Sequence, residues 1–334
     1  MSATTDYLKR LLRGTPLDAI HTREMFGEFL DGKASKAQMG AVLAALRMKG
    51  ERSEELVGAA QAVIERSSNF CGDYDVVDTC GTGNGSAPTF NVSTAAAIVA
   101  ATLGASVLKH VAPKVTSRCG SREVLDTLRV RFSGTPIEAD ASIREHGIAF
   151  VAYDAALPQM RELIETAAEL EARTIVDILV PFTNPATPRF QVVGATNVSQ
   201  LMPIARALGE LGRERVWVVR GNDGIDELTV TEASQVVIYE NDAVTKMELD
   251  PRDYGLELWA PESIRGGTPV ENASMMHEVL SGKRTGSLRD FTALNAAATL
   301  VVAGVSKNLM VGVESAKQAL TDGSPWRLLK ALTV

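Results

Sequence analysis

The chain has few of the residues that build disulfide frameworks or zinc sites. Its 334 residues include three cysteines and four histidines, and neither type forms a closely spaced set. An odd number of cysteines without a close pair excludes a disulfide scaffold and is typical of reduced, buried thiols. The scattered histidines do not match the ligand spacings of zinc proteins. These absences predict a cytoplasmic protein.

Long apolar runs are also missing. No stretch approaches the roughly 18 apolar residues that a spanning helix needs, and residues 1–14 lack the apolar core of a secretory signal. We therefore expect no contact with a membrane. The net charge of −7 also disfavours nucleic acid as a partner. An anionic ligand would need local amides, basic side chains or a bound metal to overcome this charge.

The pattern that is present changes near residue 74. Amphipathic helical segments are expected before it, near 5–13, 22–31, 35–49 and 53–68. After it, β-rich runs alternate with helices, at 76–78, 106–108, 148–151, 174–179, 191–194, 216–219, 235–239 and 244–249. This alternation predicts an α/β fold with a mainly parallel central sheet. We expect a small all-helical domain at 1–72, joined by a helix near 157–172, and a larger α/β domain at 73–334.

A glycine-rich turn follows the first expected strand. Gly81, Gly83 and Gly85 allow positive φ angles and close approach of a ligand to the backbone. Successive backbone N–H groups can then hold an anion, and a helix from Ser93 points its positive end toward the same place. No Gly-Lys-Ser/Thr follows, so this is not a Walker loop. By itself the turn fits either a phosphate site or a tight strand-to-helix connection.

Two further segments favour the phosphate interpretation. Residues 109–121 carry three cations and three hydroxyl side chains ahead of a helix, which suits an anion clamp. Asp226 and Glu227 follow the strand at 216–219, and adjacent carboxylates at a strand end suit Mg²⁺ shared with a phosphate. Taken singly, either segment could be an ordinary surface loop.

Together these motifs resemble the anthranilate phosphoribosyltransferase family over nearly the whole chain. The family's Q-x-G-A-F-L-x-A-L-R-x-K-G is similar to residues 38–50, and its G-T-G-G-D-G-x-x-T-F-N-I-S-T to residues 81–94. Its K-H-G-N-R-S-V-S-S-x-S-G-S is similar to residues 109–121. Its L-G-P-L-T-N-P, D-E and G-G-T-P-x-E-N-A are similar to residues 179–185, 226–227 and 266–273.

The resemblance implies a Mg²⁺-dependent phosphoribosyltransferase of tryptophan biosynthesis, usually a homodimer. It would move phosphoribosyl from 5-phosphoribosyl 1-diphosphate to a small aromatic amine, anthranilate in the family. No acid, base or nucleophile is implied, because the protein's main task is to position and neutralise pyrophosphate. The implied metal ligands are Ser93, Asp226 and Glu227. The residues implied for donor binding are Gly81, Thr82, Gly83, Asn84, Gly85, Thr89, Asn91, Val92, Ser93, Thr94, Lys109, Lys114, Thr116, Ser117 and Ser121.

The acceptor side departs from the family pattern. The asparagine of K-H-G-N-R is Ala112 here, and the last arginine of H-P-x-x-R-H-x-x-x-V-R is Ala167. In the glycine-rich turn, G-D-G becomes Asn-Gly-Ser at 84–86. The candidate acceptor contacts are therefore His110, Ala112, Arg161 and Ala167. A guanidinium–carboxylate pair is the natural way to select anthranilate, and Ala167 cannot form one.

Three functional alternatives stay open at this point. The protein could use anthranilate through altered contacts, or carry out the same transfer on a different aromatic or heterocyclic acceptor. It could also be a non-catalytic paralogue that binds a nucleotide, a nucleic acid or a protein.

Overall fold

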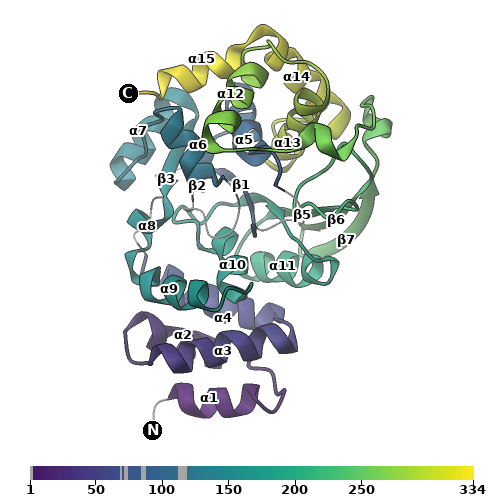
Figure 1. Ribbon diagram of the computed structural model, residues 1–334. Coiled ribbons are helices and arrows are strands. Elements are labelled where there is room, and N and C mark those ends of the chain that lie inside the picture. Colours follow the sequence, from purple (N-terminus) through teal and green to yellow (C-terminus); the bar gives the residue numbers. More distant parts are fainter. Residues whose placement is uncertain (1–2, 68–69, 71–73, 84–87, 112–118) are drawn as a thin grey trace.

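The computed structural model describes residues 3–67, 70, 74–83, 88–111 and 119–334. The chain opens with helices that form a layer of their own at one end of the molecule (Figure 1). These are α1 (Ala3–Leu11), α2 (Ala19–Leu30), α3 (Lys36–Lys49) and α4 (Ser53–Ile64). A capping box between Ser35 and Gln38 begins α3, and Gly50 ends it with a φ of 84°. The all-helical opening predicted from the sequence is therefore confirmed.

The described residues then form one seven-stranded sheet in the order β3-β2-β1-β4-β5-β6-β7. Its strands are β1 (Val77–Gly81), β2 (Val107–Val111), β3 (Ile148–Ala152), β4 (Phe190–Gly194), β5 (Arg215–Gly221), β6 (Ser234–Glu240) and β7 (Ala243–Leu249). The strands from β3 to β5 are parallel, and β6 and β7 are antiparallel. The predicted mainly parallel sheet is therefore confirmed.

The order of the strands places a switch point between β1 and β4. The chain adds β2 and β3 on one side of β1, and then returns to add β4 and β5 on the other side. Where the direction of winding reverses in an open α/β sheet, the loops at the carboxyl ends of the strands separate and leave room for a ligand. The glycine-rich turn follows β1 at this point.

Helices cover both faces of the sheet and enclose two apolar cores (Figure 1). One face carries α5 (Val92–Thr102), α6 (Ser121–Thr127), η3 (Pro251–Tyr254), η4 (Pro261–Ile264), α12 (Pro269–Leu280), α13 (Ser287–Val302), α14 (Leu309–Asp322) and α15 (Ser324–Ala331). The other carries α7 (Pro136–His146), α8 (Tyr153–Ala156), η1 (Pro158–Met160), α9 (Arg161–Glu169), α10 (Ile175–Leu179), η2 (Val180–Thr183) and α11 (Val198–Glu210). The α3 and α4 helices pack against this second layer, through α9, α10 and α11.

One expected strand is wrong. Residues 174–179 form the short helix α10, because the Thr174 side chain accepts the Val176 N–H while Asp177 accepts the Thr174 N–H. A short apolar run buried on all sides does not by itself distinguish a strand from a helix, and this capping box decides for the helix. The helix expected near 157–172 is also divided, into η1 and α9.

Among the described residues, no helix combines the length and the apolar composition needed to cross a bilayer.

Candidate active site

The centre of the candidate site is the point where β1 and β4 end side by side. Gly81 ends β1, Gly194 ends β4, and the two are paired in register. The loop after β5 brings Asp226 against both glycines. A Cβ on Gly194 would lie 1.7 Å from the Asp226 carbonyl oxygen, and one on Gly81 would lie 2.7 Å from the Asp226 Oδ2. The absence of side chains at these two strand ends is what lets Asp226 lie at the switch point.

Asp226 and Glu227 form a partly buried acidic pair. Burial raises the pKa of the Asp226 carboxyl, although hydrogen bonds from backbone N–H groups, that of Gly83 included, and the Arg173 charge oppose this. Burial, followed by the Asp226 charge, raises the pKa of Glu227 to about 8 against the opposing charge of Lys109. Among the described residues, no three His, Cys, Asp or Glu side chains converge on one point. A divalent cation here would rest on this pair and on ligand oxygens, which is how Mg²⁺ is commonly held.

Lys109 places a buried cation beside the glycine-rich turn. The sequence predicts it at the start of a loop, but it lies within β2 and is only 2% exposed. Its Nζ donates to the carbonyl oxygen of Thr79 and lies 3.5 Å from the Ser93 Oγ. Ser93 and Thr94 belong to the first turn of α5, and the buried Thr94 hydroxyl has no hydrogen-bond partner among the described residues. This turn thus combines backbone N–H groups, a hydroxyl and a lysine, the donor set that a phosphate needs.

The element at 266–273 holds the start of α5 in place. The Nδ2 of the buried Asn272 donates to the Asn91 Oδ1 at 2.7 Å, and its own Oδ1 accepts a backbone N–H. The Asn91 Nδ2 then faces the carbonyl oxygen of Cys119, 3.4 Å away. Thr89 forms a β-bridge with the residue preceding the element. Two candidate donor residues are therefore positioned by a segment far along the chain.

Of the other residues expected to bind the donor, Thr82 and Gly83 directly follow β1. Val92 is the first residue of α5, and Ser121 is the first of α6. Six expected contacts lie outside the described residues, namely Asn84, Gly85, Ala112, Lys114, Thr116 and Ser117.

His110 lies on the opposite face of β2 from Lys109. It is 1% exposed, its Nδ1 is 3.2 Å from an Asp78 oxygen, and its Nε2 is 2.8 Å from the Val180 carbonyl oxygen. Burial lowers the pKa of His110, but the Asp78 charge, the Cys80 charge and the hydrogen bonds to these two residues together outweigh it and raise the pKa to about 10. The ring of Tyr153 lies 5.8 Å from the His110 ring. Both ring nitrogens are thus engaged inside the protein, and the expected acceptor contact falls on a buried ion pair.

The remaining expected acceptor residues belong to α9. Arg161 is exposed at the start of that helix. Ala167 is partly buried and packs toward the apolar core shared with the opening helices. The structure therefore joins most donor residues at the strand ends but leaves Arg161 and Ala167 on a separate helix.

Four residues in and around the site were not predicted as part of it. They are Arg173, Gly194, Asn272 and Asp78. Gly194 ends a predicted strand, and Asn272 belongs to a recognised motif, so those signals were available. Arg173 offers no sequence signal, because only the folded chain brings it to Thr82 and Thr196.

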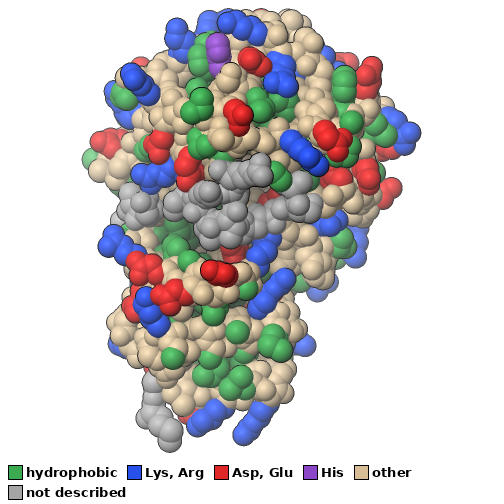
Figure 2. Space-filling model, in the orientation of Figure 1, with side chains coloured by type: hydrophobic (Ala, Val, Ile, Leu, Met, Phe, Trp, Pro, Cys, Tyr) green, Lys and Arg blue, Asp and Glu red, His purple; other side chains and the backbone are tan. Residues whose placement is uncertain are grey.

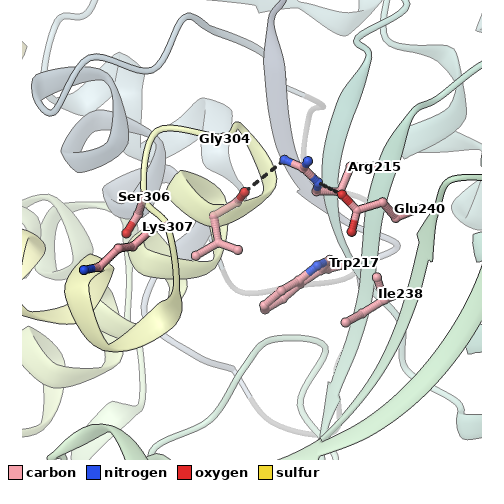
Figure 3. Close-up of a pocket in the computed structure, with 8 residues that line it drawn as sticks. Arg215, Trp217, Ile238, Glu240, Gly304, Ser306 and Lys307 are labelled. Atoms are coloured by element: carbon pink, nitrogen blue, oxygen red, sulfur yellow. Dashed lines mark hydrogen bonds and ion pairs between the residues drawn. The ribbon is translucent and has the colours of Figure 1, made fainter.

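A separate hollow of about 360 Å³ lies between strands β5 and β6 and the end of α13 (Figure 3). Trp217 and Arg215 line it from β5. The Arg215 Nε binds Glu240 at 2.6 Å, and its Nη1 donates to the carbonyl oxygens of Val301 and Val302. Arg215 therefore caps the end of α13 and joins it to β5 and β6. None of the candidate site residues lines this hollow.

The fold and the strand-end site define the class of the protein. The model described as "Glycosyl transferase family, a/b domain" matches residues 73–325, and "Glycosyl transferase family, helical bundle domain" matches residues 5–67. Anthranilate phosphoribosyltransferases of Methylobacterium radiotolerans and Myxococcus xanthus are each 40% identical to the chain. The aligned parts cover 97% of this chain and 94% of the first relative, and 92% and 91% for the second. The chain belongs to the anthranilate phosphoribosyltransferase family, and it is an enzyme of the phosphoribosyltransferase class.

Solved structures agree with this assignment. The crystal structure of anthranilate phosphoribosyltransferase from Thermus thermophilus superposes with a TM-score of 0.91 at 32% identity, over 99% of this chain and 98% of that one. The enzyme from Saccharomyces cerevisiae, solved in complex with PRPP and Mg, has a TM-score of 0.86 at 22% identity, over 98% of this chain and 96% of that one. At that identity the second comparison shows the shared fold.

Proposed function

We propose that the protein transfers phosphoribosyl from 5-phosphoribosyl 1-diphosphate to the amino group of a small aromatic acceptor, with Mg²⁺. The observation that carries this proposal is the acidic pair Asp226-Glu227 held against paired glycines at the switch point of the sheet. The buried Lys109 and the first turn of α5 lie beside it. The names of the relatives support the choice of the donor and of the metal.

The chain's own residues position the donor and do not attack it. Backbone N–H groups at Gly81 to Gly83 and at the start of α5 would bind the phosphates. Lys109 offsets negative charge near Ser93. The C1–O bond to pyrophosphate breaks and a C1–N bond to the acceptor amine forms, so charge develops on the leaving group. Fixed donors at that position stabilise the transition state more than the ground state.

The residues present fit a magnesium ion. The raised pKa values of these two neighbouring carboxyl groups show that burial and mutual repulsion penalise their charged forms, and a bound cation would relieve that penalty. Asp226 and Glu227 would hold the ion, with the Ser93 hydroxyl as a further oxygen ligand. When bound, Mg²⁺ supplies positive charge to the departing pyrophosphate.

Two kinds of molecule are candidates for the acceptor. Anthranilate is the first, because the relatives are named for it. A different aromatic or heterocyclic amine is the second, and one observation favours it: Ala167 packs toward the helical core and offers no cation to a carboxylate. The exposed Arg161 lies at the other end of the same helix.

Three further features belong to this proposal. A homodimer is supported by apolar side chains on the opening helices, such as Ile20 at 69% and Met48 at 90% exposure, and Figure 2 shows apolar side chains on the surface of this layer.

A cytoplasmic location is supported by the free thiols of Cys80 and Cys119. The packing of α9 on α3 supports a helical domain made of 1–72 with the segment near 157–172, beside an α/β domain at 73–334.

Calorimetry tests the donor half of the proposal. Titration with 5-phosphoribosyl 1-diphosphate is expected to give heat that depends on Mg²⁺. Replacing the acidic pair by Asp226→Asn with Glu227→Gln is expected to weaken binding by at least about tenfold, the scale of one lost charge-assisted contact. The melting temperature should change little, because removing two crowded charges relieves their repulsion.

The exposed Glu232 provides the matched control, because it lies in the same β5–β6 connection. Glu232→Gln should leave binding unchanged. Absence of heat with and without Mg²⁺ in the unaltered protein would reject the proposal. A screen of aromatic amines, read as pyrophosphate release, then separates anthranilate from other acceptors.

A further inference from the structure

Arg173 connects the ends of the two strands that flank the switch point. Its Nη2 donates to the Thr82 carbonyl oxygen at 3.1 Å and is 3.2 Å from the Thr82 Oγ1. Its Nη1 donates to the Thr196 Oγ1. Thr82 directly follows β1, and Thr196 lies two residues after β4. One guanidinium group thus touches the turn after each strand.

The backbone next to Arg173 is held in place by the helix that follows. The next residue, Thr174, caps α10, and α10 packs against α3 and α4. The side chain therefore reaches from the segment just before α10 to the strand ends. Thr82 is nearly buried, so its place in the glycine-rich turn depends on what it contacts inside the protein.

We propose that Arg173 is a positioning residue that bridges Thr82 after β1 and Thr196 after β4 and thereby fixes the backbone at Thr82 for binding of the diphosphate. This inference rests on the proposed function, because the ligand is the phosphoribosyl donor. The planar guanidinium suits the task, since two separate nitrogens can bind two turns at once. A lysine ammonium keeps the charge but cannot span both turns with a fixed geometry.

Steady-state kinetics of the full-length enzyme tests the bridge. Arg173→Met is expected to raise the KM for 5-phosphoribosyl 1-diphosphate by roughly tenfold, the equivalent of about 1.4 kcal/mol, with a smaller change in kcat. The KM for the acceptor should change much less. Arg173→Lys should recover less than half of the loss. Full recovery with lysine would overturn the bridge, because charge alone would then suffice.

Arg220 offers the matched control, because its Nε donates to the Thr196 carbonyl oxygen without reaching Thr82. Arg220→Met is expected to raise the donor KM less than Arg173→Met does. An equal rise would overturn the proposal, since holding the turn after β4 would then be enough.

A double-mutant cycle with Thr196→Val completes the test. If Arg173 acts through Thr196, the two changes together should raise the donor KM by less than the product of their single effects. A fully multiplicative result would overturn the bridge. Calorimetry separates the two levels of inference: donor binding by the unaltered enzyme together with an unchanged Arg173→Met variant rejects the bridge alone. Absence of donor binding by the unaltered enzyme rejects the proposed function and the bridge with it.

Discussion

The strand ends and helix α9 are built in contrasting ways. At the strand ends, Asp226 lies so close to Gly81 and Gly194 that a single added carbon would collide with it. On α9, Arg161 is exposed and Ala167 is partly buried. At the strand ends, the acidic residue is held by close contact with the backbone, whereas α9 presents its side chains from the surface of one helix.

The difference shows which half of the reaction the fold constrains. Binding a diphosphate requires backbone N–H groups and carboxylates at fixed positions, so few side chains can change without moving the others. An acceptor touched by one or two side chains can be exchanged by changing those side chains alone. The departures from the family motif at Ala112 and Ala167 fall on the acceptor side, and the one at 84–86 falls in the glycine-rich turn of the donor side.

The largest expected effect comes from adding one methyl group at the strand ends. Gly194→Ala would place a Cβ 1.7 Å from the Asp226 carbonyl oxygen. The acidic loop must move, so we expect donor turnover to fall by at least about a hundredfold, the loss that a misplacement of about 1 Å can cause. Strain of about 1–3 kcal/mol should also lower the melting temperature. Pyrophosphate release and thermal melting measure both effects.

A glycine-to-alanine substitution beside α9 is the control. Gly40 lies in α3 facing α9, and a Cβ there would lie 3.8 Å from the nearest Leu170 atom. Gly40→Ala should stabilise the helix by about 0.5–1 kcal/mol and leave turnover unchanged. Equal losses from both substitutions would remove the contrast between the two regions.

The second largest effect is on stability beneath the strand ends. In Asp78→Asn, the charged His110 loses its buried partner, which should cost about 3–5 kcal/mol. Because the pKa of His110 is raised to about 10 in the fold, its stabilisation is complete below about pH 6.5 and disappears as the pH rises toward 10. Melting curves of both proteins should therefore converge between pH 6.5 and 10.

Asp140, which is 32% exposed and pairs with Arg144 at 2.9 Å, is the control for this stability test. Asp140→Asn should change stability by less than about 1 kcal/mol at every pH in this window. A difference between Asp78→Asn and the unaltered protein that does not vary with pH would contradict the ion pair.

The smallest effect is expected on α9. Ala167→Arg restores the guanidinium of the family motif, and we expect kcat/KM for anthranilate to rise by about three- to tenfold, with the donor KM unchanged. Ala168→Arg, one residue further on the same helix, should give no gain. Fluorescence of anthranilate follows the reaction. A gain of equal size in both variants would show that general charge, and not position, selects the acceptor.

Much of the fold could be predicted because its signals are local. Capping residues such as Ser35 and alternating β-rich runs mark helices and strands without reference to distant parts of the chain. The failure at 174–179 has the same cause, because two short apolar pairs around Asp177 carry no clear period, and the capping box of Thr174 with Asp177 decided the outcome. The glycine-rich turn and the acidic pair were also found as motifs.

The sequence did not show which face of β2 each side chain points to. Lys109 and His110 are neighbours in the sequence, yet the strand sends the first toward Ser93 and the second toward Asp78. The prediction of a loop at 109 treated both as possible ligand contacts. Strand geometry separates them, since successive side chains point to opposite faces.

By itself, the sequence determined the class of the protein, the elements of its fold, and the residue types for a phosphate and magnesium site. These depend on local pattern and on motifs written in consecutive residues. Only the tertiary structure decided that Asp226 lies against Gly81 and Gly194, that Asn272 orients Asn91, and that Arg173 joins the turns after β1 and β4. These contacts join residues far apart in the sequence, and they arise because parallel strands bring their carboxyl ends to one edge of the sheet.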